Sequence, residues 1–156
     1  MRQRIRMAVI VLLVIGLVVA GYEGYRLFTE KPHHEPPVSS VTDTTDDGWQ
    51  VVSYLGVTVE VPPGWARLDM GFCGESTERW GPADLDPCAT DLGLWFLASA
   101  TFDPATGPGV HAAPASDNLP QGGWAGYVTR GKVVVNVAGP DQNVVRRVLQ
   151  SVSQPI

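Results

Sequence analysis

The most concentrated group of polar side chains in this chain lies between its two cysteines and just after them. Acidic residues dominate the group, which also contains one arginine and one tryptophan. Carboxylates gathered in this way can bind calcium or a basic partner, and an exposed tryptophan can stack on a ligand. The alternative is a solvated acidic loop with no ligand. The candidate binding residues are Trp80, Arg79, Glu75, Glu78, Asp84 and Asp86, and Asp91 follows them.

The two cysteines, Cys73 and Cys88, indicate a disulfide that closes this stretch into a loop. Both follow a segment that predicts export to an oxidising compartment, where an even number of cysteines favours pairing. The bridge would close 16 residues and stabilise the fold by roughly 3 kcal/mol. Because a bridged loop loses little entropy on binding, we expect it to carry the recognition surface.

The chain has five tryptophans within 76 positions, a density that can provide a stacking surface for sugars or peptides. Trp65, Trp95 and Trp124 lie in or beside predicted strands, and we assign them to the core. We expect Trp49 and Trp80 to be exposed, with Trp80 inside the disulfide loop.

Motifs for catalysis are missing from the sequence. It contains no G-x-S-x-G, no H-E-x-x-H, no phosphate-binding G-x-x-x-x-G-K-[ST] and no G-x-G-x-x-G. His111 is the one histidine after the amino-terminal region, and we expect it to be exposed in a loop rich in glycine and proline. His33 and His34 lie between Glu30 and Glu35, but adjacent histidines in a flexible linker rarely converge on one ion. We therefore expect no enzyme activity, no cofactor and no metal site.

The amino terminus predicts a membrane segment. Arg2, Arg4 and Arg6 precede residues 7–21, which contain no polar side chain, and arginines in this position stay in the cytoplasm. We interpret residues 1–28 as a cytoplasmic stub and a single-pass transmembrane anchor that leaves the rest of the chain outside. The alternative is a signal peptide cleaved near Ala20, which would release a secreted protein.

The charge of the chain excludes a general nucleic-acid binder. The whole sequence has a net charge of −5, and residues 30–156 contain seven cations and 15 acids, which gives −8. Such a domain lacks the basic face that nucleic acids require. Basic partners suit it better, and a protein of the cell envelope is the expected partner besides the membrane.

The pattern of apolar residues predicts a linker followed by one domain. Residues 29–48 are rich in proline, serine, threonine and aspartate and predict a disordered linker, so the domain covers residues 49–156. Strands are expected at 55–61, 92–102, 122–129 and 132–139, the last two joined by a tight turn at Arg130-Gly131. Residues 103–121 read as a long loop.

The carboxyl terminus predicts a helix that begins after the cap residue Asp141. Its apolar residues recur on one face, whereas Arg146, Arg147 and Gln150 face outward. The sequence therefore predicts an α+β fold, with a small antiparallel sheet covered by a carboxyl-terminal helix and preceded by one amino-terminal transmembrane helix. The apolar face of the helix consists of Val144, Val145, Val148, Leu149 and Val152.

The start of the domain resembles the opening of many small exported bacterial domains that are common in actinobacteria. That opening runs from tyrosine-x-glycine-valine to valine-proline-x-glycine-tryptophan, and here it reads Tyr54-Leu55-Gly56-Val57 and Val61-Pro62-Pro63-Gly64-Trp65. The end, with Leu149, Ser151 and Val152, is also similar to such domains, and in this respect the chain looks weakly PsbP-like. The disulfide loop stands where those domains have a helix. The resemblance implies a binding or accessory module and supplies no catalytic residues.

We expect a membrane-anchored extracytoplasmic binding or accessory module of the bacterial cell envelope, whose ligand the sequence does not name. Two alternatives belong to other classes. One is a small envelope enzyme, such as a metal-assisted hydrolase that uses the acidic loop. The other is a structural subunit of a membrane complex.

Overall fold

The computed structural model describes residues 37–74 and 77–154. These residues belong to one compact unit, Pro36–Ile156. The predicted anchor, residues 7–21, and most of the predicted linker lie outside the described residues. Within the described residues, no helix combines the length and the apolar character needed to cross a membrane.

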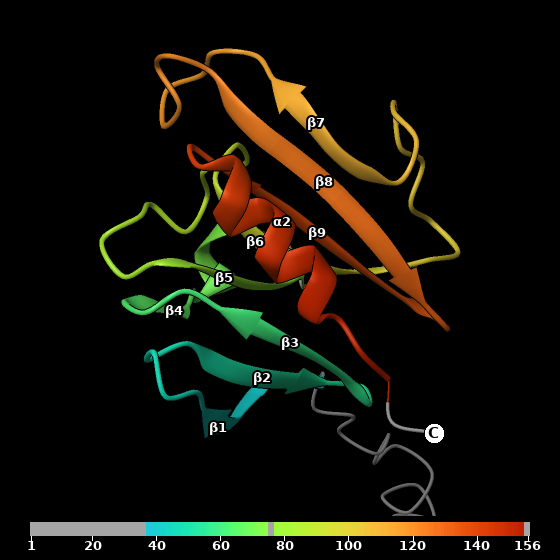
Figure 1. Ribbon diagram of the computed structural model, residues 1–156. Helices are drawn as coiled ribbons and strands as arrows, with labels where there is room; N and C mark the ends of the chain where they lie inside the picture. The colour runs from blue at the N-terminus through green and yellow to red at the C-terminus, as the bar shows by residue number, and fades with distance from the viewer. Residues whose placement is uncertain (1–36, 75–76, 155–156) are drawn as a thin grey trace, which may run out of the picture. The chain divides into compact units, whose positions relative to one another are not determined.

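The described residues form two antiparallel sheets and one α-helix (Figure 1). The small sheet has the order β1-β2-β3, and the large sheet has the order β4-β5-β6-β9-β8-β7. The strands of the small sheet are β1 (Ser40–Thr44), β2 (Gln50–Tyr54) and β3 (Val57–Val61). Those of the large sheet are β4 (Trp65–Arg67), β5 (Glu78–Pro82), β6 (Gly93–Ala98), β7 (Gly109–Ala113), β8 (Gly123–Arg130) and β9 (Val133–Gly139). A short 3-10 helix, η1 (Met70–Cys73), follows β4, and α2 (Gln142–Ser151) ends the domain.

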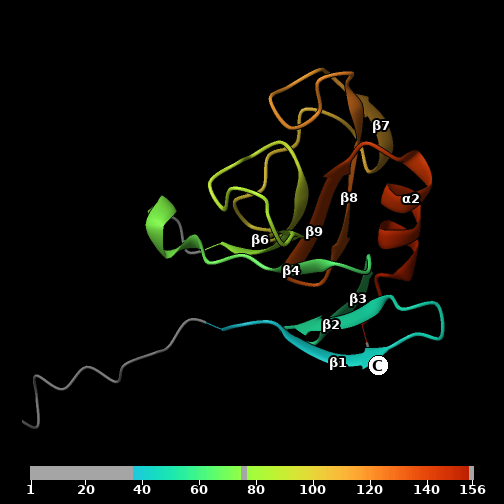
Figure 2. The same ribbon diagram turned by 90° about the vertical axis from the view of Figure 1, so that its left-hand side faces the viewer.

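The core lies between the large sheet, the small sheet and α2. In β9 the side chains of Val133, Val135 and Val137 alternate toward this core, where Val145 and Val148 of α2 meet them. Figure 2 shows α2 on one side of β8 and β9, with connecting loops on the other side. Because β9 has neighbours on both edges and is covered on both faces, its sequence is apolar at nearly every position.

The structure confirms the helix predicted at the carboxyl terminus. Asp141 is its N-cap, and its side chain accepts a hydrogen bond from the backbone N–H of Asn143 at 2.7 Å. Val145, Val148 and Leu149 are buried, and Arg146 is exposed. The apolar residues that recur with a helical period in the sequence are therefore the residues that α2 buries.

The predicted fold class is confirmed for the antiparallel strands and the helix, but the strands form two sheets instead of one. The hairpin between β8 and β9 is also confirmed, with its two turn residues shifted by one to Gly131-Lys132; Gly131 has the positive φ, +56°. The strand predicted at 55–61 begins only at Val57, because Leu55 adopts a positive φ of 50° in the β2–β3 turn.

Five of the described strands were not predicted, namely β1, β2, β4, β5 and β7, and two of these, the edge strands β1 and β7, lie in segments that were predicted to be a linker and a loop. β1 lies within the segment that was predicted to be a disordered linker, so the domain includes residues before Trp49. β7 lies within the predicted loop 103–121. All five residues of β1 are exposed, and β7 contains no fully buried residue, so neither strand has the alternation that reveals a half-buried strand.

Candidate functional site

The predicted disulfide is present between Cys73 and Cys88, whose Cα atoms are 5.4 Å apart. It joins the end of η1 to the connection between β5 and β6. Such a bridge is typical of an oxidising compartment outside the cytoplasm. The bridged segment is not a free loop, however, because it contains all of β5.

The prediction that Trp80 is exposed is wrong. Trp80 lies in β5 between β4 and β6, and only 4% of its surface is accessible. Its neighbours Glu78 and Arg79 are buried as well, at 6% and 1%. Three of the candidate binding residues are therefore inside the domain, Asp84 and Asp86 are exposed, and Glu75 lies outside the described residues.

Buried Glu78 is held by a network that joins Ser39, just before β1, to the large sheet. Its carboxylate accepts hydrogen bonds from the backbone N–H and the hydroxyl of Ser39 and from Arg67 Nε at 2.7 Å. Ser39 Oγ in turn accepts a hydrogen bond from Trp80 Nε1 at 2.7 Å. Burial favours the neutral acid, but the hydrogen bonds from Arg67 and Ser39 outweigh it, so the pKa of Glu78 lies below its ordinary value. This arrangement makes Glu78 a structural residue.

The buried side chain of Arg79 holds the β5–β6 connection through hydrogen bonds. Its Nη1 donates to the carbonyl of Pro87, and its Nη2 donates to the carbonyl of Leu92 at 2.6 Å. The guanidinium also lies over the ring of Trp95, 4.7 Å from its centroid. Arg79 therefore shapes the loop that follows β5, and its own surface is not accessible to a ligand.

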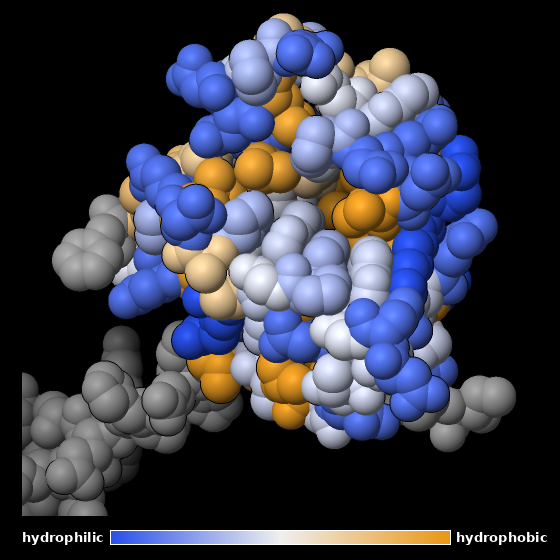
Figure 3. Space-filling view, turned by 60° about the vertical axis from the view of Figure 1, so that its left-hand side comes forward, coloured by the Kyte–Doolittle hydropathy of each residue, from blue (hydrophilic) through white to orange (hydrophobic). Residues whose placement is uncertain are grey.

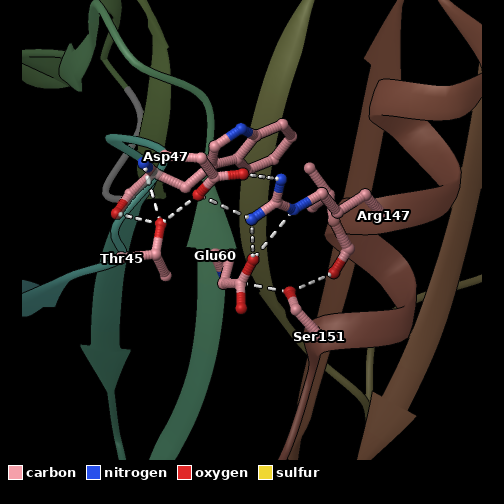
Figure 4. Close-up of polar contacts among 7 residues, drawn as sticks. Thr45, Asp47, Glu60, Arg147 and Ser151 are labelled. Carbon is pink, nitrogen blue, oxygen red and sulfur yellow. Dashed lines mark hydrogen bonds and ion pairs between the residues drawn. The ribbon is translucent and has the colours of Figure 1, made fainter.

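A second ionic network joins α2 to the small sheet (Figure 4). Arg147 contacts Asp47 at 2.5 Å and Glu60 at 2.8 Å, and its guanidinium lies 3.9 Å from the centroid of the Trp49 ring. The hydrogen bonds lower the pKa of Asp47 and raise the pKa of Arg147, so both groups stay ionised. Trp49, predicted to be exposed, is half-buried in this network, which we call the seam.

Five aspartates that form no ion pair with an arginine in the described part of the chain lie at one end of the large sheet. They lie in three connections, β5–β6, β7–β8 and β9–α2. These connections are at the same end of the sheet because the strands they follow or precede pair in antiparallel register. Among the described residues, none of the five carboxylates lies within 4 Å of a cationic side chain. We call this surface the acidic end, and it consists of Asp84, Asp86, Asp91, Asp117 and Asp141.

The acidic end contains a hollow of about 650 Å³ between the β5–β6 and β7–β8 connections. Asp86, Asp91 and Asp117 line it together with Asn118. Asn118 donates to both carboxylate oxygens of Asp91, at 3.0 Å from its backbone and 2.8 Å from its side chain. The nearby Ser116 hydroxyl and the hydrogen bonds from Asn118 lower the pKa of Asp91 to about 2, so its negative charge is fixed in place.

An apolar groove of about 570 Å³ adjoins this hollow, and Asn118 lines both. Its walls come from β7, the β7–β8 connection, the start of β8 and the β9–α2 connection, with Ala112, Leu119, Trp124 and Pro140 among them. Trp124 is half-buried here, so its assignment to the core is only partly right. Figure 3 shows a surface on which hydrophilic residues surround smaller apolar areas.

Metal ligands do not gather in the part of the chain that the structure describes. No three histidine, cysteine, aspartate or glutamate side chains lie close enough together there to hold an ion. His111, predicted to lie exposed in a loop, lies instead in β7, with its Nε2 2.8 Å from the carbonyl oxygen of Gly107.

The sequence predicted only part of this surface. Asp84 and Asp86 were among the candidate residues, and Asp91 was placed beside them. Asp117 and Trp124 were not candidates, because they reach the site only through the pairing of β7, β8 and β9. Comparison of the chain with protein-family models, with curated proteins and with solved structures finds no match.

Proposed function

We propose that this chain is a membrane-anchored module outside the cytoplasm that binds a basic partner protein at the cell envelope. The apolar segment at residues 7–21 and the arginines before it support the anchor, and the disulfide supports an oxidising location. The proposal makes the chain a binding module and not an enzyme. The acidic end is its recognition surface.

The observation that carries the proposal is the contrast in charge compensation. Asp47, Glu60 and Glu78 form ion pairs with arginines of the same domain, whereas the five aspartates of the acidic end have no cationic side chain within 4 Å among the described residues. Clustered charges of one sign raise the local concentration of oppositely charged partners and speed their association. Lysine and arginine side chains of a partner would supply the missing counter-charges.

The shape of the surface also favours binding. Asp91 is held by Asn118 and carries its charge at every physiological pH, so one carboxylate of the hollow is already oriented before a partner arrives. Arg79 and the disulfide hold the β5–β6 connection in the same way. Preorganisation of this kind lowers the entropy that is lost on binding.

The test uses the full chain in detergent micelles and a fluorescein-labelled lysine-rich peptide as the basic probe. We expect Asp86→Asn with Asp117→Asn to weaken the binding of this probe about tenfold, with a smaller dependence on salt. The matched control is Asp46→Asn with Asp103→Asn, which removes two exposed aspartates elsewhere. Equal affinities for the two double variants would contradict the proposal.

The location is tested separately. Protease added to intact spheroplasts should digest the domain if the amino terminus lies inside and residues 37–154 lie outside. Full protection of the domain would overturn the proposed topology. A mature protein that begins near Gly21 would favour the secreted form. The metal-assisted hydrolase and the structural subunit have no specific observation in their favour among the described residues.

A further inference from the structure

The last strand of the large sheet, β7, offers a free edge beside the apolar groove. Within the described residues β7 pairs with one strand only, β8, so the backbone groups on its other side have no strand partner. Unpaired edges of this kind are templates for another strand unless charges, prolines or bulges block them. The sequence of β7, Gly-Val-His-Ala-Ala, contains none of these blocks, and Pro108 and Pro114 limit the edge to its five residues.

The side chains of β7 leave room over Trp124. Ala112 lies opposite Trp124 in the β7–β8 pairing, so both point to the same face of the sheet. Because Ala112 carries only a methyl group, the Trp124 ring stays partly uncovered, and both residues line the groove of about 570 Å³. A strand added outside β7 would place every second side chain on this face, next to Ala112.

The negative charge of the aspartates next to the groove favours a segment with cationic side chains. The groove and the acidic hollow share Asn118, and Asp117 lies next to it in the chain. A segment that runs along β7 therefore reaches the carboxylates at the end where β7 meets the β7–β8 connection. A cationic side chain there gains the electrostatic attraction that an acidic or neutral segment does not.

We propose that β7 binds an extended segment of a basic partner protein by strand addition, with an apolar side chain over Ala112 and Trp124 and a lysine or arginine at the acidic hollow. This inference rests on the proposed function and names its mode of recognition. Main-chain hydrogen bonds to β7 would provide affinity, and the groove and the carboxylates would provide specificity, as in other complexes formed by strand addition.

The first part of the test compares two labelled peptides with the full chain in micelles, by fluorescence anisotropy. One is Thr-Val-Lys-Val-Lys-Thr, and the other has the same side chains with N-methyl groups on alternate residues. The methyl groups remove backbone donors and keep every charge, so strand addition predicts binding that is at least about tenfold weaker. Equal binding of the two peptides would overturn strand addition.

The second part fills the groove. Ala112→Leu places a branched side chain over Trp124 and should weaken the unmethylated peptide about fivefold or more, because the apolar position is occupied. Ala105→Leu is the matched control, since Ala105 is exposed in the β6–β7 connection at the opposite end of the sheet. The peptide should bind this control as it binds the unchanged protein. Equal binding to the two variants would overturn the assignment of the groove.

The results also separate this inference from the proposed function. If both peptides bind equally and Ala112→Leu has no effect, while Asp86→Asn with Asp117→Asn still weakens binding, the acidic end binds basic partners without strand addition. If neither peptide binds and the aspartate variants match their controls, both proposals fail. Self-association of the chain that Ala112→Leu abolishes, without peptide binding, would assign the edge to a second copy and overturn the inference.

Discussion

The seam and the acidic end use the same side-chain chemistry for opposite purposes. At the seam, Asp47 and Glu60 share Arg147, which ties α2 to the small sheet across 100 and 87 positions of sequence. At the acidic end, the carboxylates either bond to nearby backbone and amide groups or face solvent. The first arrangement uses negative charge to join elements of the fold, and the second leaves it available to another molecule.

Glu78 extends this comparison to the interior. Its carboxylate is buried, yet it retains its charge because Arg67 and Ser39 donate to it. A buried carboxylate without these partners would be expensive, whereas an exposed carboxylate such as Asp84 needs none. The number of acidic residues in a stretch of sequence therefore says little about binding until their partners are known.

The largest expected effect comes from removing the buried carboxylate. Glu78→Ala leaves the buried backbone N–H and hydroxyl of Ser39 without their acceptor and should lower the free energy of unfolding by about 2–4 kcal/mol. Arg67, which is 47% exposed, regains water and limits the loss. Urea denaturation followed by tryptophan fluorescence measures the change. Glu78→Gln keeps the shape and should lose less, and a loss no greater than that of Asp84→Ala would contradict the distinction between the two carboxylates.

A smaller effect is expected at the seam. Arg147→Ala removes two ion pairs and the contact with the Trp49 ring, so it should destabilise the domain, but less than Glu78→Ala because Arg147 is well solvated. Arg146→Ala is the matched control, since among the described residues the Arg146 side chain forms a hydrogen bond only with Asn143, one turn away on the same exposed helix face. A double-mutant cycle of Arg147→Ala with Glu60→Ala should show coupling. Additive effects would show that the ion pair does not hold α2 to the small sheet.

The pH dependence of stability should report the orientation of Asp91. Its pKa falls from 3.8 to about 2 on folding, so the ionised form stabilises the native state above pH 3.8 and this contribution is lost as the pH falls toward 2. Asp91→Asn removes that dependence. The variant should therefore show a shallower loss of stability than the unchanged chain between these pH values, measured by urea denaturation at fixed ionic strength. Parallel curves would mean that Asp91 has the same pKa in the folded and unfolded states.

The parts of the fold with strong local signals were predictable from the sequence. The helix after Asp141 has both a cap and a period of 3.6, and β9 has an apolar run beside a glycine turn. The disulfide followed from the number of cysteines and the expected compartment. Each of these signals depends on neighbouring residues or on composition, which the sequence displays directly.

The misjudged parts depend on partners that are distant in the sequence. The sequence of β5, Glu-Arg-Trp-Gly-Pro, resembles a polar loop. It is nevertheless a buried strand, because Ser39 and Arg67 bind Glu78 and the chain after β5 covers Arg79. The edge strand β1 is exposed throughout and β7 has no fully buried residue, so neither shows the alternation of a half-buried strand. The same limit applies to the candidate site. Asp84 and Asp86 were predicted, but Asp86 and Asp117 come to line one hollow only in the folded sheet.

The smallest effect on stability is expected for the exposed carboxylates of the acidic end. Asp84→Asn and Asp117→Asn each remove an exposed carboxylate with no arginine partner, so each should change the free energy of unfolding by less than about 0.5 kcal/mol. At low salt the combined variant should be slightly more stable than the unchanged chain, because the aspartates repel one another. At about 1 M salt, where the screening length is about 3 Å, that gain should disappear. A loss of stability at low salt would show that these carboxylates already have cationic partners within the fold, and the acidic end would then be a second seam and not a surface free to bind.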